Sequence, residues 1–359
     1  MTTEQSWPVL AETDREILVR SLLPVLLEQI TGPENGEEAW YRIAGKRFRL
    51  SCGTGDAALY FRRQMAFMET GADDGPECGV IRILQDPRMD EACGRIRARR
   101  GTLETETTLG KIRILVYNTA LLHGIAFAWI PQAKAGCILF SAEGWAGFTG
   151  VSHNLAPILK WIGEDTGCVM LHAACVGRDD TACLISGLSG SGKSTLAAAA
   201  LCRGLDYVSD DTILLDSQNR TAYPVCSTIH ISPDTCRLLS ELPVSGGELT
   251  PGRANKRHLS LEAFSGQVRD SLKASCLVEV QIREGKAGEY RRTRIDPLLM
   301  RLAWSSAFQI GADTDSEYTR SIVRSLHGLP AYTLSADRDM DQNIQMLKRI
   351  LREAGRNGG

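Results

Sequence analysis

Residues 187–195 read Gly187-Leu188-Ser189-Gly190-Ser191-Gly192-Lys193-Ser194-Thr195. The first eight residues match G-x-x-x-x-G-K-[S/T], in which backbone N–H groups of a glycine-rich loop wrap a polyphosphate. Glycine suits this loop because it adopts left-handed backbone conformations and has no Cβ to keep the phosphates away. The stretch therefore predicts a loop that binds the phosphates of a nucleoside triphosphate.

Both flanks of the loop agree with this prediction. The apolar run 182–186 predicts a buried strand, and the Ala/Leu-rich run 196–201 has high helix propensity. In a strand–loop–helix unit of this kind, Lys193 reaches the β- and γ-phosphates, and the hydroxyl of Ser194 is a ligand of Mg²⁺. We expect residues 187–195 to form the nucleotide site, with Mg²⁺ as its metal.

Length and composition exclude several classes of protein. The chain has 359 residues, enough for two domains, and its 43% hydrophobic and 23% charged residues are typical of globular proteins. A net charge of −2 provides no general attraction to nucleic acid. No apolar run approaches the roughly 20 residues of a membrane-spanning helix, and the first residues do not resemble a signal peptide. We expect a cytoplasmic protein that binds neither nucleic acid nor membranes.

The eleven cysteines are scattered singly, and no two of them form a C-x-x-C pair. Several lie in apolar stretches, as free buried thiols do. The pattern favours free thiols in a reducing compartment over disulfides or metal ligands.

The pattern of the chain changes near residue 150. Before it, an apolar helical pattern from Ile17 to Ile30 contains Pro24, which predicts a kink or two shorter helices. Alternating segments then predict a hairpin around Gly45-Lys46 and several further strands. We interpret residues 1–150 as a β-rich α+β domain without a chemical motif, which is available to bind a substrate or partner.

Residues 151–359 predict an α/β domain built from tight strand–loop–helix units. The interval 169–176 predicts one strand, and the loop strand and its helix follow. The remaining expected elements are a helix at 154–163, strands at 205–208, 221–231, 276–282 and 332–334, and helices at 296–308, 315–327 and 337–353.

Asp210 and Asp211 supply the second half of a candidate site. They follow a predicted strand, and Asp210 lies 17 residues after Lys193. That length accommodates one helix and a return strand parallel to the first, as in a βαβ unit. One carboxylate at this place can hold Mg²⁺ opposite Ser194, while the other accepts a proton from an attacking hydroxyl group.

These features resemble the C-terminal domain of the HPr kinase/phosphorylase family. That family belongs with ATP-dependent phosphoenolpyruvate carboxykinase in one superfamily of P-loop enzymes. The shared features are a histidine on the strand before the loop, the loop, an Arg-Gly step after its helix and an aspartate pair: His172, residues 187–194, Arg203-Gly204 and Asp210-Asp211. The resemblance covers about residues 165–354 and is dense only in 169–216.

The resemblance implies an HPr kinase/PEP carboxykinase-like P-loop fold and a kinase that uses ATP and Mg²⁺. Asp210 would be the general base that deprotonates a substrate hydroxyl group, and Asp211 would hold Mg²⁺ together with Ser194. His172 would lie close to the catalytic carboxylate, and Lys193 would complete the catalytic set. Because HPr kinases assemble as hexamers, the resemblance also implies a homo-oligomer.

Two departures from HPr kinase narrow the expected substrate. The residue after the loop serine is Thr195, where HPr kinase typically has glutamate, and that family's Glu-x-Arg-Gly-x-Gly signature is absent. Tyr223-Pro224 and the run 229–233 instead resemble HPr-kinase-related kinases of peptide modification, including lasso-peptide kinases, which carry an N-terminal β-rich extension. The resemblance then implies phosphorylation of a hydroxyl group, serine above all, in a peptide or protein other than HPr.

A cation is needed near the transferred phosphoryl group, and the sequence offers several. The candidates are Lys256, Arg257, Arg292 and Arg294. Lys256-Arg257-His258 end the polar, glycine-rich stretch 244–257, which suits a lid over the substrate.

Two alternatives remain open at this point. The acceptor of a kinase could be free serine or another small metabolite. The nucleotide could instead act as a switch in a protein that binds a peptide without phosphoryl transfer, although such a binder would not need Asp210.

Overall fold

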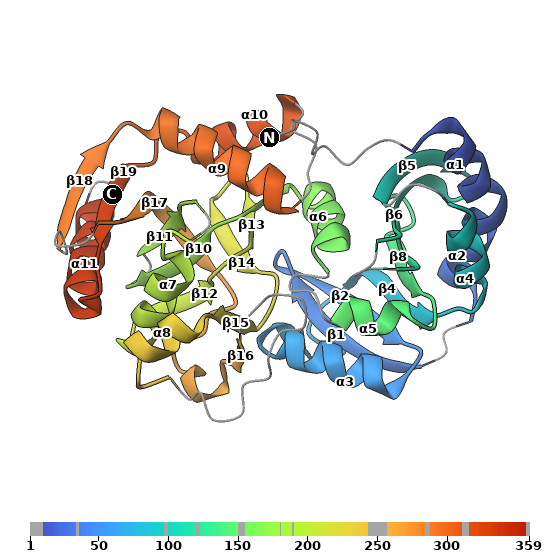
Figure 1. Ribbon diagram of the computed structural model, residues 1–359, viewed down its shortest axis with the longest axis horizontal. Coiled ribbons are helices and arrows are strands. Elements are labelled where there is room, and N and C mark those ends of the chain that lie inside the picture. Colours follow the sequence, from blue (N-terminus) through green and yellow to red (C-terminus); the bar gives the residue numbers. More distant parts are fainter. Residues whose placement is uncertain are drawn as a thin grey trace. The chain divides into compact units, whose positions relative to one another are not determined.

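The computed structural model describes residues 10–33, 36–96, 100–119, 123–149, 155–179, 181–188, 190–242, 257–283, 288–310 and 316–356 (Figure 1). The contacts divide the chain into two compact units, unit 1 up to Asp165 and unit 2 from Thr166 onward. The predicted division at residue 150 differs from this boundary because helix 156–165 packs against strands of unit 1. Each unit contains one large mixed sheet with helices, so the chain is a mixed α/β protein.

Unit 1 is rich in strands. Its helical elements are α1 (Glu12–Ile17), the π-helical turn η1 (Leu18–Leu22), α2 (Leu23–Thr31), α3 (Gly55–Gln64), the 3₁₀ turn η2 (Ala66–Met68), α4 (Arg88–Arg95), α5 (Gly144–Thr149) and α6 (Ala156–Asp165). Its strands are β1 (Glu37–Ile43), β2 (Lys46–Cys52), β3 (Glu69–Thr70), β4 (Glu77–Gln85), β5 (Arg100–Thr107), β6 (Gly110–Tyr117), β7 (Ile125–Ile130) and β8 (Ala135–Phe140).

These strands form one sheet in the order β3-β1-β2-β4-β8-β7-β6-β5, in which β4 runs parallel to both of its neighbours. Leu18, Leu26 and Met89 from the helices α1–α2 and α4 pack on one face, against residues such as Ile114 and Ala126. On the other side, aromatic residues of α3 and α5 pack against Phe127 of β7 and Phe140 of β8; the helix residues are Tyr60, Phe61, Trp145 and Phe148. Unit 1 therefore has its own two-sided core.

Unit 2 contains the predicted phosphate loop. Its strands are β9 (Cys168–Leu171), β10 (Ala174–Arg178), β11 (Thr181–Ser186), β12 (Asp206–Ser209), β13 (Ile213–Asp216), β14 (Thr221–Pro224), β15 (Thr228–Ile231), β16 (Arg257–Ser260), β17 (Leu272–Ile282), β18 (Glu289–Thr293) and β19 (Ala331–Ala336). Its helical elements are α7 (Lys193–Cys202), α8 (Pro233–Leu238), the 3₁₀ turn η3 (Glu262–Phe264), α9 (Ile295–Ile310), α10 (Ser316–Leu326) and α11 (Met340–Arg356).

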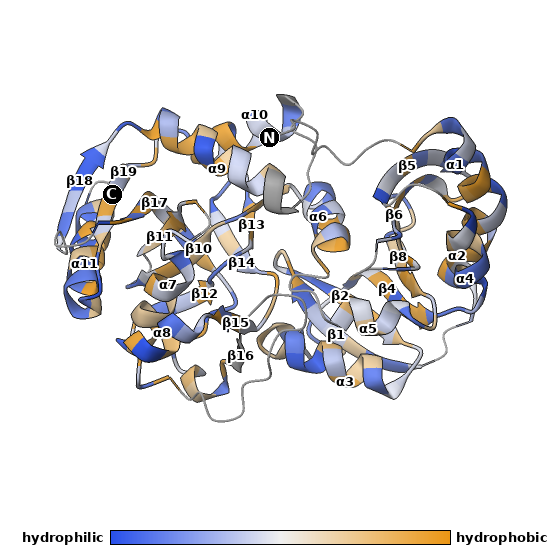
Figure 2. Cartoon of the chain, in the orientation of Figure 1, coloured by the Kyte–Doolittle hydropathy of each residue, from blue (hydrophilic) through white to orange (hydrophobic). Residues whose placement is uncertain are grey.

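Nine of these strands form the central sheet of unit 2. The order is β12-β10-β11-β17-β14-β13-β9, and β19 joins the second half of β17 and carries β18 at its far side. Helices α9 and α10 cover one face, where Leu302 and Ile322 pack with Leu171, Leu184 and Leu277. Helices α7 and α11 cover the opposite face (Figure 1). Figure 2 shows hydrophilic and hydrophobic residues alternating around α11, as a helix needs when only one side meets a sheet.

The strand predicted at 169–176 is interrupted in the structure. The chain forms β9, leaves the sheet at His172-Ala173, and continues as β10 with different partners: β9 pairs with β13, whereas β10 pairs with β11 and β12. The single-strand prediction was therefore wrong, because the apolar pattern is the same in both halves. The eleven cysteines are all free thiols and most of them are buried, as predicted. Within the described residues, no helix combines the length and the apolar character that crossing a membrane requires.

Candidate active site

The predicted phosphate loop connects the buried strand β11 to α7. Gly190 and Gly192 adopt left-handed conformations with φ of 79° and 93°, and Gly192 is the residue before the first turn of α7. A Cβ at Gly187 would lie 2.3 Å from Ser191 Oγ and 3.0 Å from the carbonyl oxygen of Val280. The glycines are therefore required by the backbone path itself, as the pattern predicted. Ser189 lies outside the described residues.

Lys193 is the first residue of α7 and is only 6% exposed. Its Nζ donates a hydrogen bond of 2.8 Å to the carbonyl oxygen of Gly187, so the side chain folds back over the loop. Ser194 follows it and is half-buried at the same helix end. The free N–H groups and positive dipole end of a helix N-terminus favour an anion, and the lysine ammonium group adds a full charge.

Thr195 and Arg203-Gly204 make structural contacts. The hydroxyl of Thr195 lies 2.7 Å from that of Thr235, which connects α7 to the first turn of α8. Gly204 ends α7 with a φ of 73°, and Arg203 bonds to Asp341 on α11. These contacts fix the helix that carries Lys193.

The interruption between β9 and β10 brings His172 to the aspartate pair. Leu171 lies opposite Ile213 and Cys175 lies opposite Ser209, so residues 172–174 face residues 210–212 across two neighbouring strand breaks. We call residues 172–174 and 210–212 together the corner. His172 Nδ1 lies 3.2 Å from Asp211 Oδ1 there. The backbone N–H of His172 donates to Ser306 Oγ of α9 at 2.9 Å, which anchors the corner to the covering helix.

The two aspartates differ in their surroundings. Asp210 is fully buried, and the hydroxyl of Tyr207 donates to its Oδ1 at 3.2 Å. Burial, and then the neighbouring Asp210, raise the pKa of Tyr207 well above its ordinary value, so the phenol keeps its proton and stays a donor. The side chain of Asp211 is 16% exposed and contacts His172. His172 thus lies beside the aspartate pair and contacts Asp211.

The loop and the corner lie at the same edge of the sheet. Strand β10 is antiparallel to both β11 and β12, so β11 and β12 run in the same direction and end together. The predicted parallel return strand is therefore present, with β10 inserted between the two strands. Because Asp210-Asp211 follow β12 and Gly187 follows β11, both sets of residues extend from the carboxyl ends of parallel strands, where α/β proteins bind ligands.

Glu279 and Arg301 belong to this edge and were not predicted. Glu279 pairs with Ser186 in the parallel ladder of β11 and β17, directly before Gly187. Its buried carboxylate accepts two bonds from Arg301 of α9, one of them 2.9 Å from Nη2. Arg301 remains 46% exposed along its side chain. The sequence did contain a signal for this pair, because Glu279 lies inside the apolar strand 276–282. A carboxylate that is buried in such a strand needs a cationic partner.

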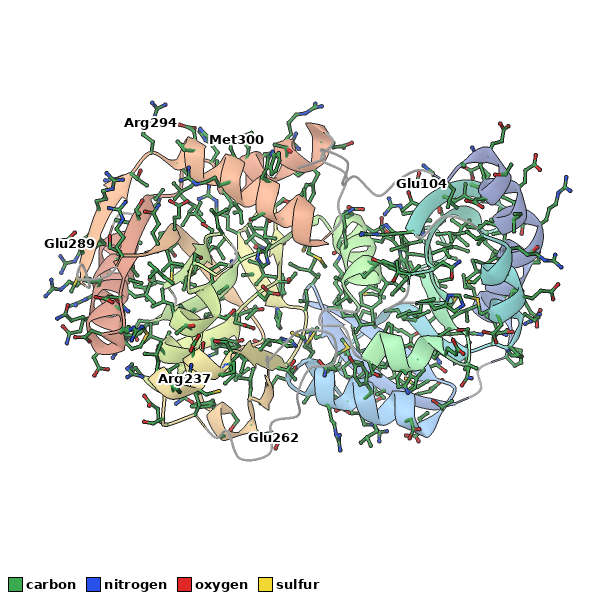
Figure 3. The ribbon with its side chains drawn as sticks, viewed as in Figure 1. Glu104, Arg237, Glu262, Glu289, Arg294 and Met300 are labelled. Carbon is green, nitrogen blue, oxygen red and sulfur yellow. The ribbon has the colours of Figure 1, made fainter. Side chains whose placement is uncertain are left out.

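The cations that the sequence suggested lie elsewhere or outside the described side chains. Arg292 is on β18, two strands from β17, and the side chain of Arg294 is 85% exposed next to Asp296. Figure 3 shows Arg294 extending into solvent. Lys256, most of the predicted lid 244–257, and the side chain of Arg257 lie outside the described residues.

The donor groups at this edge fit ATP and Mg²⁺. The loop has the glycine geometry of a phosphate cradle, and Lys193 gives it a cation. Ser194 and Asp211 offer only oxygen donors, and Mg²⁺ is commonly held by one or two carboxylates with substrate phosphates and water. The described residues contain no group of three or more His, Cys, Asp or Glu that would hold a metal alone. This donor set suits a metal that arrives with the nucleotide.

No protein-family model matches the sequence, and none of the curated proteins compared with it matches either. Among solved structures, the Hpr(Ser) kinase/phosphatase from Coxiella burnetii is similar to this chain with 15% sequence identity and a TM-score of 0.31. The similarity covers 53% of this chain and 94% of that chain. Similarity of this degree establishes neither a shared activity nor a shared site.

Proposed function

We propose that this chain is an ATP- and Mg²⁺-dependent phosphotransferase that phosphorylates a hydroxyl group, serine above all, in a peptide or protein. The observation that carries the proposal is the meeting of the phosphate loop and the Asp210-Asp211 corner at one edge of the sheet. A protein that only holds a nucleotide needs the loop but not the carboxylates beside it.

In this proposal the loop, Lys193 and the start of α7 hold the β- and γ-phosphates. Asp210 accepts the proton of the acceptor hydroxyl group as its oxygen bonds to the γ-phosphorus. The bond from that phosphorus to the β–γ bridging oxygen breaks, and ADP leaves. Mg²⁺, held by Ser194 and Asp211, supplies positive charge to the phosphate oxygens when bound. His172 keeps the carboxylate of Asp211 oriented through their 3.2 Å contact.

We assign the cation that stabilises the transferred phosphoryl group to Arg301. Its guanidinium group is fixed by Glu279, next to the strand that enters the loop, and is half exposed. A cation that is already positioned stabilises developing charge without reorganisation during the reaction.

Transfer of labelled γ-phosphate from ATP to peptides that contain serine tests the proposal, with variants Asp210→Asn and Asp211→Asn. Loss of a general base lowers kcat by about 10²–10⁴-fold, so Asp210→Asn should lose transfer while still binding ATP. Asp211→Asn should instead shift the Mg²⁺ concentration that gives half-maximal activity. Asp216→Asn is the matched control, because Asp216 ends β13 away from the corner and bonds within its own turn.

Three results would redirect the proposal. If Asp210→Asn transfers as well as the unchanged protein, Asp210 is not the base. If only free serine or another metabolite is phosphorylated, the acceptor is a small molecule. If ATP binds and neither transfer nor hydrolysis occurs with any acceptor, the chain is a nucleotide-gated binding protein.

A further inference from the structure

Strand β17 ends beside the phosphate loop with an exposed apolar side chain. Ile282, its last residue, is 57% exposed. A Cβ built on Gly192 would lie 3.7 Å from Ile282 Cγ1 and 3.8 Å from its Cδ1, so the isoleucine lies beside the glycine that precedes Lys193. A single exposed apolar residue is ordinary on a protein surface. The contact of this residue with the loop is therefore the observation that matters.

The sheet holds the backbone of Ile282 in place. Ile282 pairs with Ala336 in the parallel ladder of β17 and β19, and the N–H of Arg283 donates to the carbonyl oxygen of Ala336 at 2.9 Å. Isoleucine is branched at Cβ, which restricts rotation about χ1. The side chain of Ile282 therefore offers a fixed apolar surface next to the loop.

Ile282 and Arg301 lie on opposite faces of the sheet. Leu277 packs with residues of α9, and Glu279 binds Arg301 of α9, so both side chains point to the α9 side. Successive side chains of a strand point to opposite faces. Ile282 comes three positions after Glu279 and points to the other face, which α7 and α11 cover.

The order of the strands indicates the direction in which a bound nucleotide extends. Around the loop this order is β12-β10-β11-β17-β19. Asp210 and Asp211 follow β12, on one side of the strand that enters the loop, whereas Ile282 ends β17 on the other side. In the proposed function the γ-phosphate faces the two aspartates while the loop wraps the rest of the triphosphate. The nucleoside end of the molecule then extends toward Ile282.

We propose that Ile282 forms a subsite for the base of the bound nucleotide, in which a face of the adenine ring packs against the isoleucine side chain. This inference rests on the proposed function, because it takes the orientation of the triphosphate from it. The free energy of such a contact follows the apolar area removed from water. The subsite therefore adds affinity for the base and leaves the hold on the phosphates unchanged.

The test compares two ligands that share a triphosphate, ATP and inorganic tripolyphosphate. Each is titrated by calorimetry into the full chain in the presence of Mg²⁺. Ile282→Asn replaces apolar surface by an amide of similar size, and should weaken ATP binding by about fivefold or more while tripolyphosphate affinity changes less than about twofold. Ile282→Phe should bind ATP at least as tightly as the unchanged protein, because a base stacks on an aromatic ring.

Met300→Asn is the matched control. Met300 is 53% exposed on α9, so the variant makes a similar apolar-to-polar change on the other side of the sheet and should leave ATP affinity unchanged.

The outcomes separate the base subsite from the proposed function. Equal losses of ATP and tripolyphosphate affinity in Ile282→Asn would overturn the subsite, since Ile282 would then support the loop itself. Unchanged ATP affinity in Ile282→Asn would overturn it as well. In both cases the unchanged protein still binds ATP, so the proposed function stands. If neither ligand binds the unchanged protein, the proposed function fails and the subsite fails with it.

Discussion

At Gly187 the phosphate loop has no space for a side chain. A Cβ there would meet Ser191 Oγ at 2.3 Å and the backbone of Val280 at 3.0 Å, so Gly187→Ala must displace the start of the loop. We expect ATP affinity to fall at least tenfold, or about 1.4 kcal/mol, while circular dichroism stays unchanged. Titration calorimetry with ATP measures this loss of affinity. Gly94→Ala on α4 is the control, because no atom lies within 4 Å of the added Cβ; equal affinities for Gly187→Ala and the unchanged protein would contradict the loop assignment.

Arg301 allows a second test on a single side chain. If it stabilises the transferred phosphoryl group, Arg301→Ala should lower kcat by about 10²–10³-fold and change the KM for ATP much less. Arg301→Lys should recover part of kcat, because the charge returns without the paired bonds to Glu279. Steady-state kinetics of phosphoryl transfer measure both.

The control for Arg301 is Arg294→Ala, which removes an exposed arginine that the sequence also offered. It should leave kcat unchanged. A purely structural role for Arg301 would appear as reduced stability with kcat preserved in the folded fraction, and that outcome would refute the assignment.

The loop and the aspartates could be proposed from the sequence, whereas the pairing of Arg301 with Glu279 could not, and the reason is physical. The loop residues act within one local turn, so their spacing along the chain determines how they are arranged in space. Glu279 and Arg301 meet only because α9 folds back over β17, and their separation of 22 positions in the sequence follows no fixed pattern. Similarly, the contact of His172 with Asp211 depends on two strand breaks that occur opposite each other.

At the scale of elements, the structure confirms the prediction that Pro24 divides the first helical segment of the chain. Pro24 lacks a backbone N–H and disturbs the preceding turn of a helix. The structure forms α1, the π-helical turn η1 and α2, and Pro24 occupies the first turn of α2. The hairpin around Gly45-Lys46 is also confirmed, with Ala44 and Gly45 at φ of 49° and 72° in its turn.

The contact between α9 and the corner is a testable link between two elements. Ser306→Ala removes the acceptor of the buried N–H of His172, which should cost about 1–3 kcal/mol of unfolding free energy. Urea denaturation measures the loss. Ser305→Ala, whose hydroxyl bonds within its own helix to Leu302, should change stability by less than about 0.5 kcal/mol. Equal effects of the two variants would show that the corner does not depend on α9.

In unit 1, Asp86 connects the end of β4 to two helices. It accepts bonds from Arg88 at the start of α4 and from Gln29 on α2. The hydrogen bond with Arg88, foremost, lowers the pKa of Asp86 in the folded chain. The ionised carboxylate therefore adds stability above its unfolded pKa of about 3.9, and that stability is lost as the pH falls through the lower folded value.

Asp86→Asn should consequently destabilise unit 1 at neutral pH. The difference in urea midpoint between the variant and the unchanged protein should be constant from pH 8 to about 5 and narrow below about 4. Asp90→Asn on α4 provides a control on an exposed carboxylate. A difference that stays constant into acid would exclude the ionised carboxylate as the source.

For the molecule as a whole, the sequence predicted two domains because the strand and helix pattern changes near residue 150. The structure divides the chain after Asp165 instead, since α6 packs on unit 1: the indole N–H of Trp129 on β7 donates to Asp165. A helix with an apolar side does not reveal from its sequence which sheet it covers. The boundary therefore depends on tertiary contacts that the local pattern does not contain.

Because each unit has its own core, calorimetry of the full chain should show two unfolding transitions. All residues of the proposed nucleotide site belong to unit 2, so ATP with Mg²⁺ should raise only that transition. At one hundred times the dissociation constant, binding adds about 2.7 kcal/mol, which corresponds to roughly 5–10 °C for a unit of this size. Asp86→Asn identifies the transition of unit 1, and Lys193→Ala should abolish the shift of the other. A shift of both transitions, or a shift that survives Lys193→Ala, would contradict a nucleotide site confined to unit 2.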